Sequence, residues 1–183
     1  MPALDLLDPQ ELDEDLIDII QSSPLPGLDA GPVCPITAQK IKELLERRAL
    51  HGTKQEAGLW LLAGELDRSH SVSQSIGDRD GSFWHGIMHR REGDFSNAKY
   101  WFRQAMRHPI EPLMTSRIAR EAERIDSPLA AVPVEDLIQA KSFPCALVDL
   151  VQKAGANHVR WRKPLQWICW WEWQLLFDHC RRY

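Results

Sequence analysis

The feature of this 183-residue chain that most limits its possible folds is the succession of helical patterns from Thr53 to His108. Helical segments with an apolar face follow one another there, and the interruptions are short and contain glycine. These breaks are Gly64-Glu65, the stretch 77–81 and Gly93-Asp94. No stretch alternates apolar and polar residues long enough to predict a strand. Helices joined by short turns, without strands, predict an all-α fold.

Further helices are expected on both sides of this region, which gives roughly eight to ten in total. The first has a clear start, with Asp8 as its cap and Pro9 in its first turn. The expected helices outside the central region span residues 8–21, 37–50, 113–124, 134–140, 144–154 and 164–180.

The central region contains a repeat with a period of 29 residues. Its second copy has a Gly93-Asp94-Phe95 turn, with Gly86 seven residues earlier. Its first copy has a Gly64-Glu65-Leu66 turn, with Ala57 in the place of Gly86. The residues that follow the turns at helical spacing are Ala98, Phe102 and Ala105 in one copy, and Ser69, Ser73 and Ile76 in the other. Small residues at such sites let the two helices of a hairpin approach closely.

This arrangement resembles the tetratricopeptide (TPR) repeat, in which a Gly-x-aromatic turn joins two helices and a proline follows, as Pro109 does here. The stretch 82–96 also resembles TPR-like proteins of an uncharacterised bacterial and fungal type. The resemblance covers about 55–60 residues, and it implies a stack of antiparallel helical hairpins capped by flanking helices. It implies no activity.

Charge and proline divide the chain into three parts. Residues 1–21 carry seven acidic groups and no Lys or Arg, which leaves 22 basic against 19 acidic groups in the rest. We therefore expect an acidic helical arm (1–22), a proline-rich linker (23–36) and a single all-α TPR-like domain (37–183). The acidic helix is expected either to dock on the basic body or to remain solvated.

Composition excludes several classes of protein. With 44% apolar and 26% charged residues, the chain is typical of a soluble globular protein. No apolar run approaches the roughly 20 residues that span a bilayer, so no membrane association is expected. A net charge of −4 is not typical of a nucleic-acid-binding protein, so no nucleic acid is expected as a partner. The four cysteines are far apart, which predicts free thiols and a cytoplasmic location.

Basic and aromatic residues gather between positions 85 and 107. Lys99, Arg103 and Arg107 follow at intervals of four, which places them on one helix face suited to carboxylates. We predict a non-enzymatic interaction module that binds an acidic peptide or protein in a basic concave groove; the chain's own residues 5–18 are one candidate. The predicted binding residues are His85, His89, Arg90, Arg91, Tyr100, Trp101, Arg103 and Arg107. The alternative is a solvated face balanced by neighbouring acids.

The same stretch supports a second hypothesis, a small metal-dependent enzyme of the hydrolase type. His85, His89 and Glu92 share one helix face, and two imidazoles with a carboxylate can hold a divalent metal. The structural alternative is that both histidines line the packing of the hairpin. No other cofactor is expected, because no phosphate-binding glycine loop or Gly-x-Ser-x-Gly motif is present.

The last helix is rich in tryptophan and has no obvious solvent side. Its polar residues Gln166, Glu172 and Gln174 do not share one face. Such a helix must be enclosed by its own domain or cover a partner. We expect either burial within the helical stack or a homodimer through this helix.

Overall fold

The structure, a computed structural model, describes residues 4–183. Within this range it contains ten α-helices, two short 3₁₀ turns and no strand, so the predicted all-α fold is confirmed. None of the described helices is long and apolar enough to cross a membrane. The helices are α1 (Glu14–Ser22), α2 (Pro35–Arg48), α3 (Lys54–Ala63), α4 (Leu66–Ser73), α5 (Arg79–Glu92), α6 (Phe95–Gln104), α7 (Ile110–Ala122), α8 (Glu135–Ile138), α9 (Phe143–Ala156) and α10 (Arg162–Arg182), and the 3₁₀ turns are Pro9–Glu11 and Val159–Trp161.

Two successive helical hairpins form the centre of the chain, α3 with α4 and α5 with α6. Gly64 and Gly93 end the first helix of each hairpin in the left-handed conformation, with φ of 76° and 85°. Glycine adopts this conformation without a steric penalty. Gly86 lets the second hairpin close tightly, because a Cβ at this position would lie 2.7 Å from the Phe102 ring.

The expected helix at 8–21 is wrong in its first part. Asp8 caps only one 3₁₀ turn, by accepting a hydrogen bond from the Gln10 amide. Leu12 is then extended and buried, and α1 begins after Asp13. Because Leu12 is extended and packs in the core, the continuous helix predicted for residues 8–21 is interrupted at this residue.

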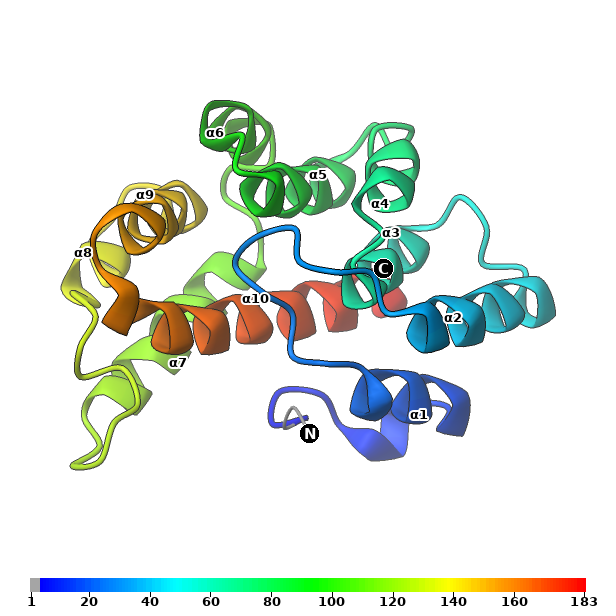
Figure 1. Ribbon diagram of the computed structural model, residues 1–183, viewed down its shortest axis with the longest axis horizontal. Helices are drawn as coiled ribbons and strands as arrows, with labels where there is room; N and C mark the ends of the chain where they lie inside the picture. The colour runs from blue at the N-terminus through cyan, green and yellow to red at the C-terminus, as the bar shows by residue number, and fades with distance from the viewer. Residues whose placement is uncertain (1–3) are drawn as a thin grey trace.

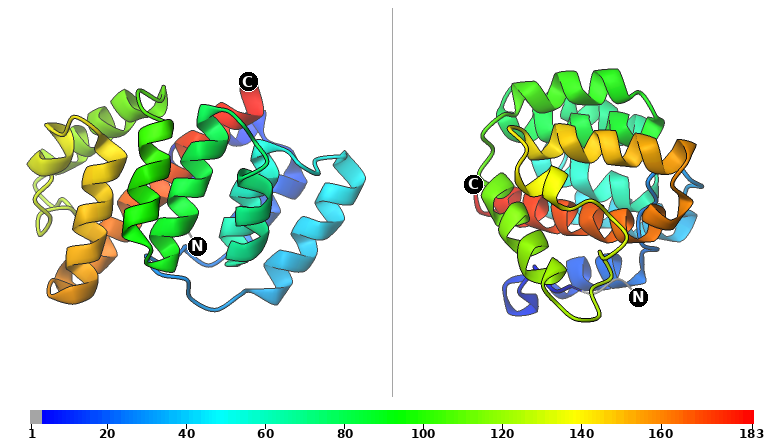
Figure 2. Two further views of the ribbon diagram at one scale, coloured as in Figure 1. Left: turned by 90° about the horizontal axis from the view of Figure 1, so that it is seen from above. Right: turned by 90° about the vertical axis from the view of Figure 1, so that its left-hand side faces the viewer.

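Helix α10 runs through the middle of the molecule (Figure 1). The hairpins and α9 lie on one side of it, and the N-terminal segment with α1 lies on the other; the end view in Figure 2 shows the same layers. Helices α3, α7 and α9 contact α10 directly. Trp170, Trp171 and Trp173 are buried within the chain, so these side chains are not available to a homodimer.

This central position explains why α10 has polar residues on several faces. Glu172 faces α5 and binds Arg90. Gln174 faces the N-terminal segment, where its side chain accepts a hydrogen bond from the Leu6 amide at 3.2 Å. Gln166 donates to the carbonyl oxygens of residues 25 and 26. Each of these three polar side chains therefore has a partner supplied by a different neighbouring segment.

The proline-rich segment 23–36 packs against the body. Leu28 is buried, and the Cys34 amide donates to the carbonyl of Ala63 at 2.8 Å. The Asp29 carboxylate pairs with Arg162 at 2.6 Å. This segment therefore covers α3 and α10.

Candidate functional site

Arg90 and Arg91 do not line an open groove, which corrects the predicted site at these two positions. Arg90 is 2% exposed and forms a two-point ion pair with the fully buried Glu172. Arg91 is also buried and donates to the backbone carbonyls of Asp29, Ala30 and Leu61. Both guanidinium groups are used inside the fold, because α10 and the segment 23–36 cover this face of α5.

The predicted basic stripe of Lys99, Arg103 and Arg107 does not form one free surface, because one of the three residues is paired within the fold. Lys99 pairs with Asp149 on α9. Arg103 and Arg107 are exposed and line a pocket of about 490 Å³, together with Lys141 from the loop before α9. Within residues 4–183, no ion pair involves Arg103, Arg107 or Lys141. The pocket thus collects three cations that have no acidic partner in the fold; we call it the basic pocket.

The backbone around the basic pocket is well fixed. Arg107 adopts a left-handed conformation with φ of 60°, which turns the chain sharply between α6 and α7. Its carbonyl oxygen accepts a hydrogen bond from Arg79 at 3.5 Å. Glu111, on the pocket wall, accepts from the His108 amide at 2.9 Å and so caps the start of α7. This acid is therefore engaged by the backbone of the turn.

The chain just before α9 forms another part of the pocket wall. Ser142 precedes the helix, its side chain caps no amide, and its buried Oγ has no hydrogen-bond partner. Pro144 occupies the first turn, as is common at helix starts. The positive end of this helix dipole adds to the field of the three cations.

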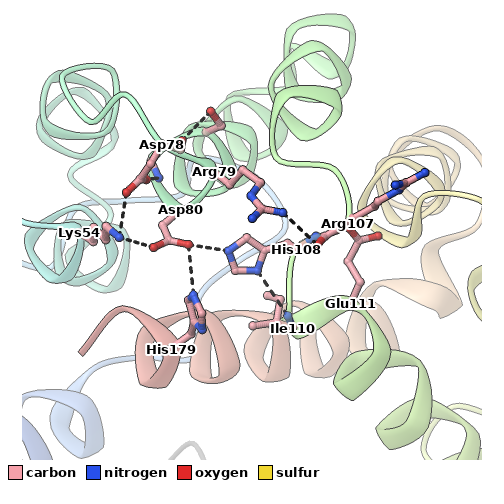
Figure 3. Close-up of polar contacts among 11 residues, drawn as sticks. Lys54, Asp78, Arg79, Asp80, Arg107, His108, Ile110, Glu111 and His179 are labelled. Carbon is pink, nitrogen blue, oxygen red and sulfur yellow. Dashed lines mark hydrogen bonds and ion pairs between the residues drawn. The ribbon is translucent and has the colours of Figure 1, made fainter. Parts of the chain in front are cut away.

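A buried polar network lies directly behind the pocket (Figure 3). Asp80 is its centre: its carboxylate accepts from His108 Nε2 at 2.7 Å and from Lys54. His179 Nε2 of α10 lies 3.4 Å from the same carboxylate. The network joins the N-terminus of α5, the turn before α7 and the end of α10. It holds the pocket-lining turn in place from the inside.

The electrostatics of this network keep Asp80 charged. Burial alone would raise its pKa, but the hydrogen bonds from His108 and Lys54 outweigh burial and hold the pKa of Asp80 well below its usual range. Burial also lowers the pKa of His179. His108 Nδ1 accepts from the Ile110 amide at 3.4 Å, so both of its ring nitrogens are occupied. Asp80 and His108 are therefore held in place by contacts within the fold.

The predicted histidines lie in a second location, between α4, α5 and α6. His85 and His89 are buried, and their rings stack 4.7 Å apart. The sequence hypothesis placed Glu92 with them as a third ligand. Instead Glu92 binds His89 Nδ1 at 3.0 Å, and His70 of α4 completes the group. The ligand atoms of the three histidines lie within 4.8 Å of one another.

The two predicted aromatic residues separate in the structure. Trp101 stacks on His85 with ring centroids 4.0 Å apart. Tyr100 is half exposed on the outer side of α6. Neither residue lines the basic pocket.

The acidic arm docks on the body, but away from the basic pocket. Its carboxylates pair with basic residues of α2, α7 and α10, in exposed bridges that each contribute little to stability. These pairs are Asp5–Arg117, Glu11–Arg181, Asp13–Arg48, Asp15–Arg47 and Asp18–Lys40. Residues 5–18 are therefore not the occupant of the predicted groove.

Comparisons with models of known protein families, with curated proteins and with solved structures found no match to this chain.

Two residues of the candidate sites, Lys141 and His70, were not predicted from the sequence. Lys141 precedes the Ser142-Phe143-Pro144 helix start, a signal that could have placed a cation at a helix N-terminus. No local spacing links His70 to His85, because they come from different hairpins.

Proposed function

We propose that this protein is a non-enzymatic interaction module that binds an acidic segment of a partner protein in the basic pocket. The observation that carries the proposal is the gathering of Arg103, Arg107 and Lys141 around one pocket without an ion-pair partner. A concavity lined by charges of one sign concentrates their field, so three cations around one pocket favour an anionic ligand from outside.

The chemistry of the pocket fits carboxylates on a peptide. Arginine can bind a carboxylate through two parallel hydrogen bonds, whereas Lys141 supplies a point charge. The positive end of the α9 dipole, beside Ser142, also favours an anion. Exposed apolar side chains, Met106 beside the pocket and Leu113 on α7, offer contact area for the rest of a peptide. The ligand we propose is therefore an extended segment with closely spaced Asp or Glu residues.

We also propose that the central hairpins are a TPR-like pair, whose last helix, α6, contributes Arg103 to the basic pocket. Support comes from the equivalent left-handed caps at Gly64 and Gly93, which are 29 residues apart. A close helix approach at Gly86 and the buried Ala57 at the equivalent site add to it. In such stacks, the surface formed by successive hairpins binds peptides.

The test uses a fluorescent peptide rich in Asp and Glu, with a peptide of the same length rich in Asn and Gln as control. Fluorescence anisotropy should show binding of the acidic peptide alone, weakening as salt rises because the attraction is between charges. The triple variant Arg103→Glu, Arg107→Glu, Lys141→Glu should bind at least about tenfold more weakly, since three attractions become repulsions.

A matched variant controls for net charge. Arg120, Arg160 and Lys163 are exposed and lie outside the pocket, so their replacement by Glu changes the total charge equally. We expect this control to bind at least severalfold more tightly than the pocket variant. Equal weakening of the two variants, or equal binding of both peptides, would contradict the proposal.

The alternative function, a small metal-dependent enzyme, rests on the cluster of His70, His85 and His89. Its first requirement is metal binding, which can be tested without assuming any reaction.

A further inference from the structure

We propose that His70, His85 and His89 form a binding site for one divalent transition-metal ion, with Zn²⁺ as the best fit. The three histidines do not line the basic pocket, so a test of this metal site does not depend on whether the proposed function is correct. The inference rests on the positions of the three rings, on a buried ring nitrogen without a partner and on the contacts that surround the rings.

The fold brings the three imidazoles together from two helices. His85 and His89 are one turn apart on α5, and His70 comes from α4, which packs against α5. The His70 ring lies 4.6 Å from His85 and 5.4 Å from His89, centre to centre. One nitrogen from each ring lies within 4.8 Å of the others. Rotations of the side chains would close this group around an ion with Zn–N distances of about 2.0–2.1 Å.

One of the imidazoles has an unused ring nitrogen inside the group. His85 and His89 are buried. A metal ion binds an imidazole through the lone pair of an unprotonated ring nitrogen. His85 Nδ1 is buried and has no hydrogen-bond partner. A buried polar atom without a partner is costly, and this one lies within the three-histidine group.

Neighbouring residues contact the histidine rings. In metal sites, residues that hydrogen-bond to the ligands fix the orientation of the ligand rings in the same way. Glu92 Oε2 lies 3.0 Å from His89 Nδ1, which leaves Nε2 for a metal. The Asn97 amide nitrogen now lies 3.1 Å from that Nε2 and would give way to the ion. On the other side, Trp101 stacks on His85 and fixes its plane. Glu92 therefore acts on the site through His89.

The donor set selects the metal. Three imidazole ligands suit Zn²⁺ and related ions such as Co²⁺, whereas Mg²⁺ and Ca²⁺ prefer oxygen ligands. His70 is only partly buried, so the ion would meet solvent on that side and complete its coordination with water. Three histidines and one water form a common arrangement for zinc.

The experiment uses the full chain without a histidine tag, freed of metal by a chelator and titrated with Co²⁺ and then Zn²⁺. We expect one equivalent of Co²⁺ to give visible absorption bands of a four- or five-coordinate ion, which Zn²⁺ abolishes by displacement. His70→Ala should weaken Zn²⁺ binding by about 100-fold or more. Replacing a residue that only hydrogen-bonds to a metal ligand already costs about 10–100-fold in metal affinity, and His70 is a proposed ligand. Glu92→Gln should weaken it by about tenfold.

Two control variants separate this site from other histidines. His51 is exposed, and His179 belongs to the group with Asp80 and His108, which also has three possible ligands. His51→Ala and His179→Ala should keep the cobalt spectrum and the Zn²⁺ affinity. Loss of binding in His179→Ala but not in His70→Ala would overturn the proposal, as would failure of the wild type to bind.

A second readout keeps the test valid if a variant is less stable. One equivalent of Zn²⁺ should raise the midpoint of thermal unfolding of the wild type and leave that of His70→Ala unchanged. Circular dichroism shows whether each variant retains its helices before titration. An equal upward shift in both proteins would contradict the assignment.

Discussion

Arg90 of α5 and Glu172 of α10 form a fully buried ion pair, with Arg90 Nη1 3.1 Å from Glu172 Oε1 and a second, parallel hydrogen bond between Nη2 and Oε2. The two residues are 82 positions apart in the chain. Their pairing fixes the second central hairpin to the helix that runs through the molecule. It also explains how a helix rich in tryptophan accommodates a glutamate.

The first prediction concerns this pair. Glu172→Gln leaves the Arg90 charge buried without its counter-ion, so we expect a loss of about 3–5 kcal/mol in the free energy of unfolding. The double variant Arg90→Met, Glu172→Met should recover most of that loss, because no buried charge remains. Urea unfolding of the wild type and these two variants measures the effect. A loss below about 1 kcal/mol in Glu172→Gln would show that the pair is not buried as described.

The second prediction tests the close packing of α5 and α6. Gly86→Ala would bring a Cβ within 2.7 Å of the buried Phe102 ring, and we expect destabilisation by about 1–3 kcal/mol. Gly155→Ala in α9 is the matched control, since nothing lies within 4 Å of its Cβ. Because alanine favours a helix, this control should be neutral or up to about 1 kcal/mol more stable. Thermal and urea unfolding distinguish the two; a stabilising Gly86→Ala would contradict the packing.

The third prediction concerns acid stability through Asp80. Its pKa in the native state is below its ordinary value, so the unfolded chain takes up the proton first as pH falls. The contribution of Asp80 is therefore complete above about pH 4 and is lost as pH falls further. Asp80→Asn should lose about 2–4 kcal/mol at neutral pH, because two charged hydrogen bonds weaken.

The measurement is urea unfolding of the wild type and Asp80→Asn between neutral pH and about pH 2. The difference between the two proteins should shrink below about pH 4. Asp126→Asn, in an exposed loop, should match the wild type throughout. A difference that stays constant with pH would show that Asp80 is not an ionised partner of His108 and Lys54.

The fourth prediction concerns thiol reactivity. Burial raises the pKa of the Cys180 thiol to about 12, whereas a hydrogen bond from Thr37 lowers the pKa of Cys34. Because the thiolate is the reactive form, iodoacetamide should alkylate Cys34 at least about tenfold faster than Cys180 in the folded protein. Peptide mass spectrometry measures the two rates, and urea should make them similar. Equal rates in the native protein would place Cys180 at the surface.

Much of the fold could be predicted from local patterns. Gly64 and Gly93 mark helix ends because their conformation is rarely adopted by other residues, and the absence of alternating segments correctly indicated an all-α fold. The lack of a solvent side on α10 was also visible, since its polar residues do not share a face, but local patterns left open whether its own domain or a partner covers it. The break at Leu12 was not predictable, because it follows from burial of that side chain in the core.

The candidate sites were harder to predict because they depend on contacts between distant segments. Arg90, Arg91 and Arg103 look alike in the sequence, but the first two are covered by α10 and by residues 23–36. Helical spacing found the face shared by His85 and His89. It could not find His70, whose position depends on how one hairpin packs on the next.

Nuclear magnetic resonance provides the most direct measurement of the central claim, that the basic pocket binds acidic segments. The amide spectrum of the ¹⁵N-labelled chain is recorded while an unlabelled peptide rich in Asp and Glu is added. We predict that the largest shifts occur at residues 103–111 and 141–145, which surround the pocket. Shifts confined to other surfaces, or no shifts at all at millimolar peptide, would contradict the claim.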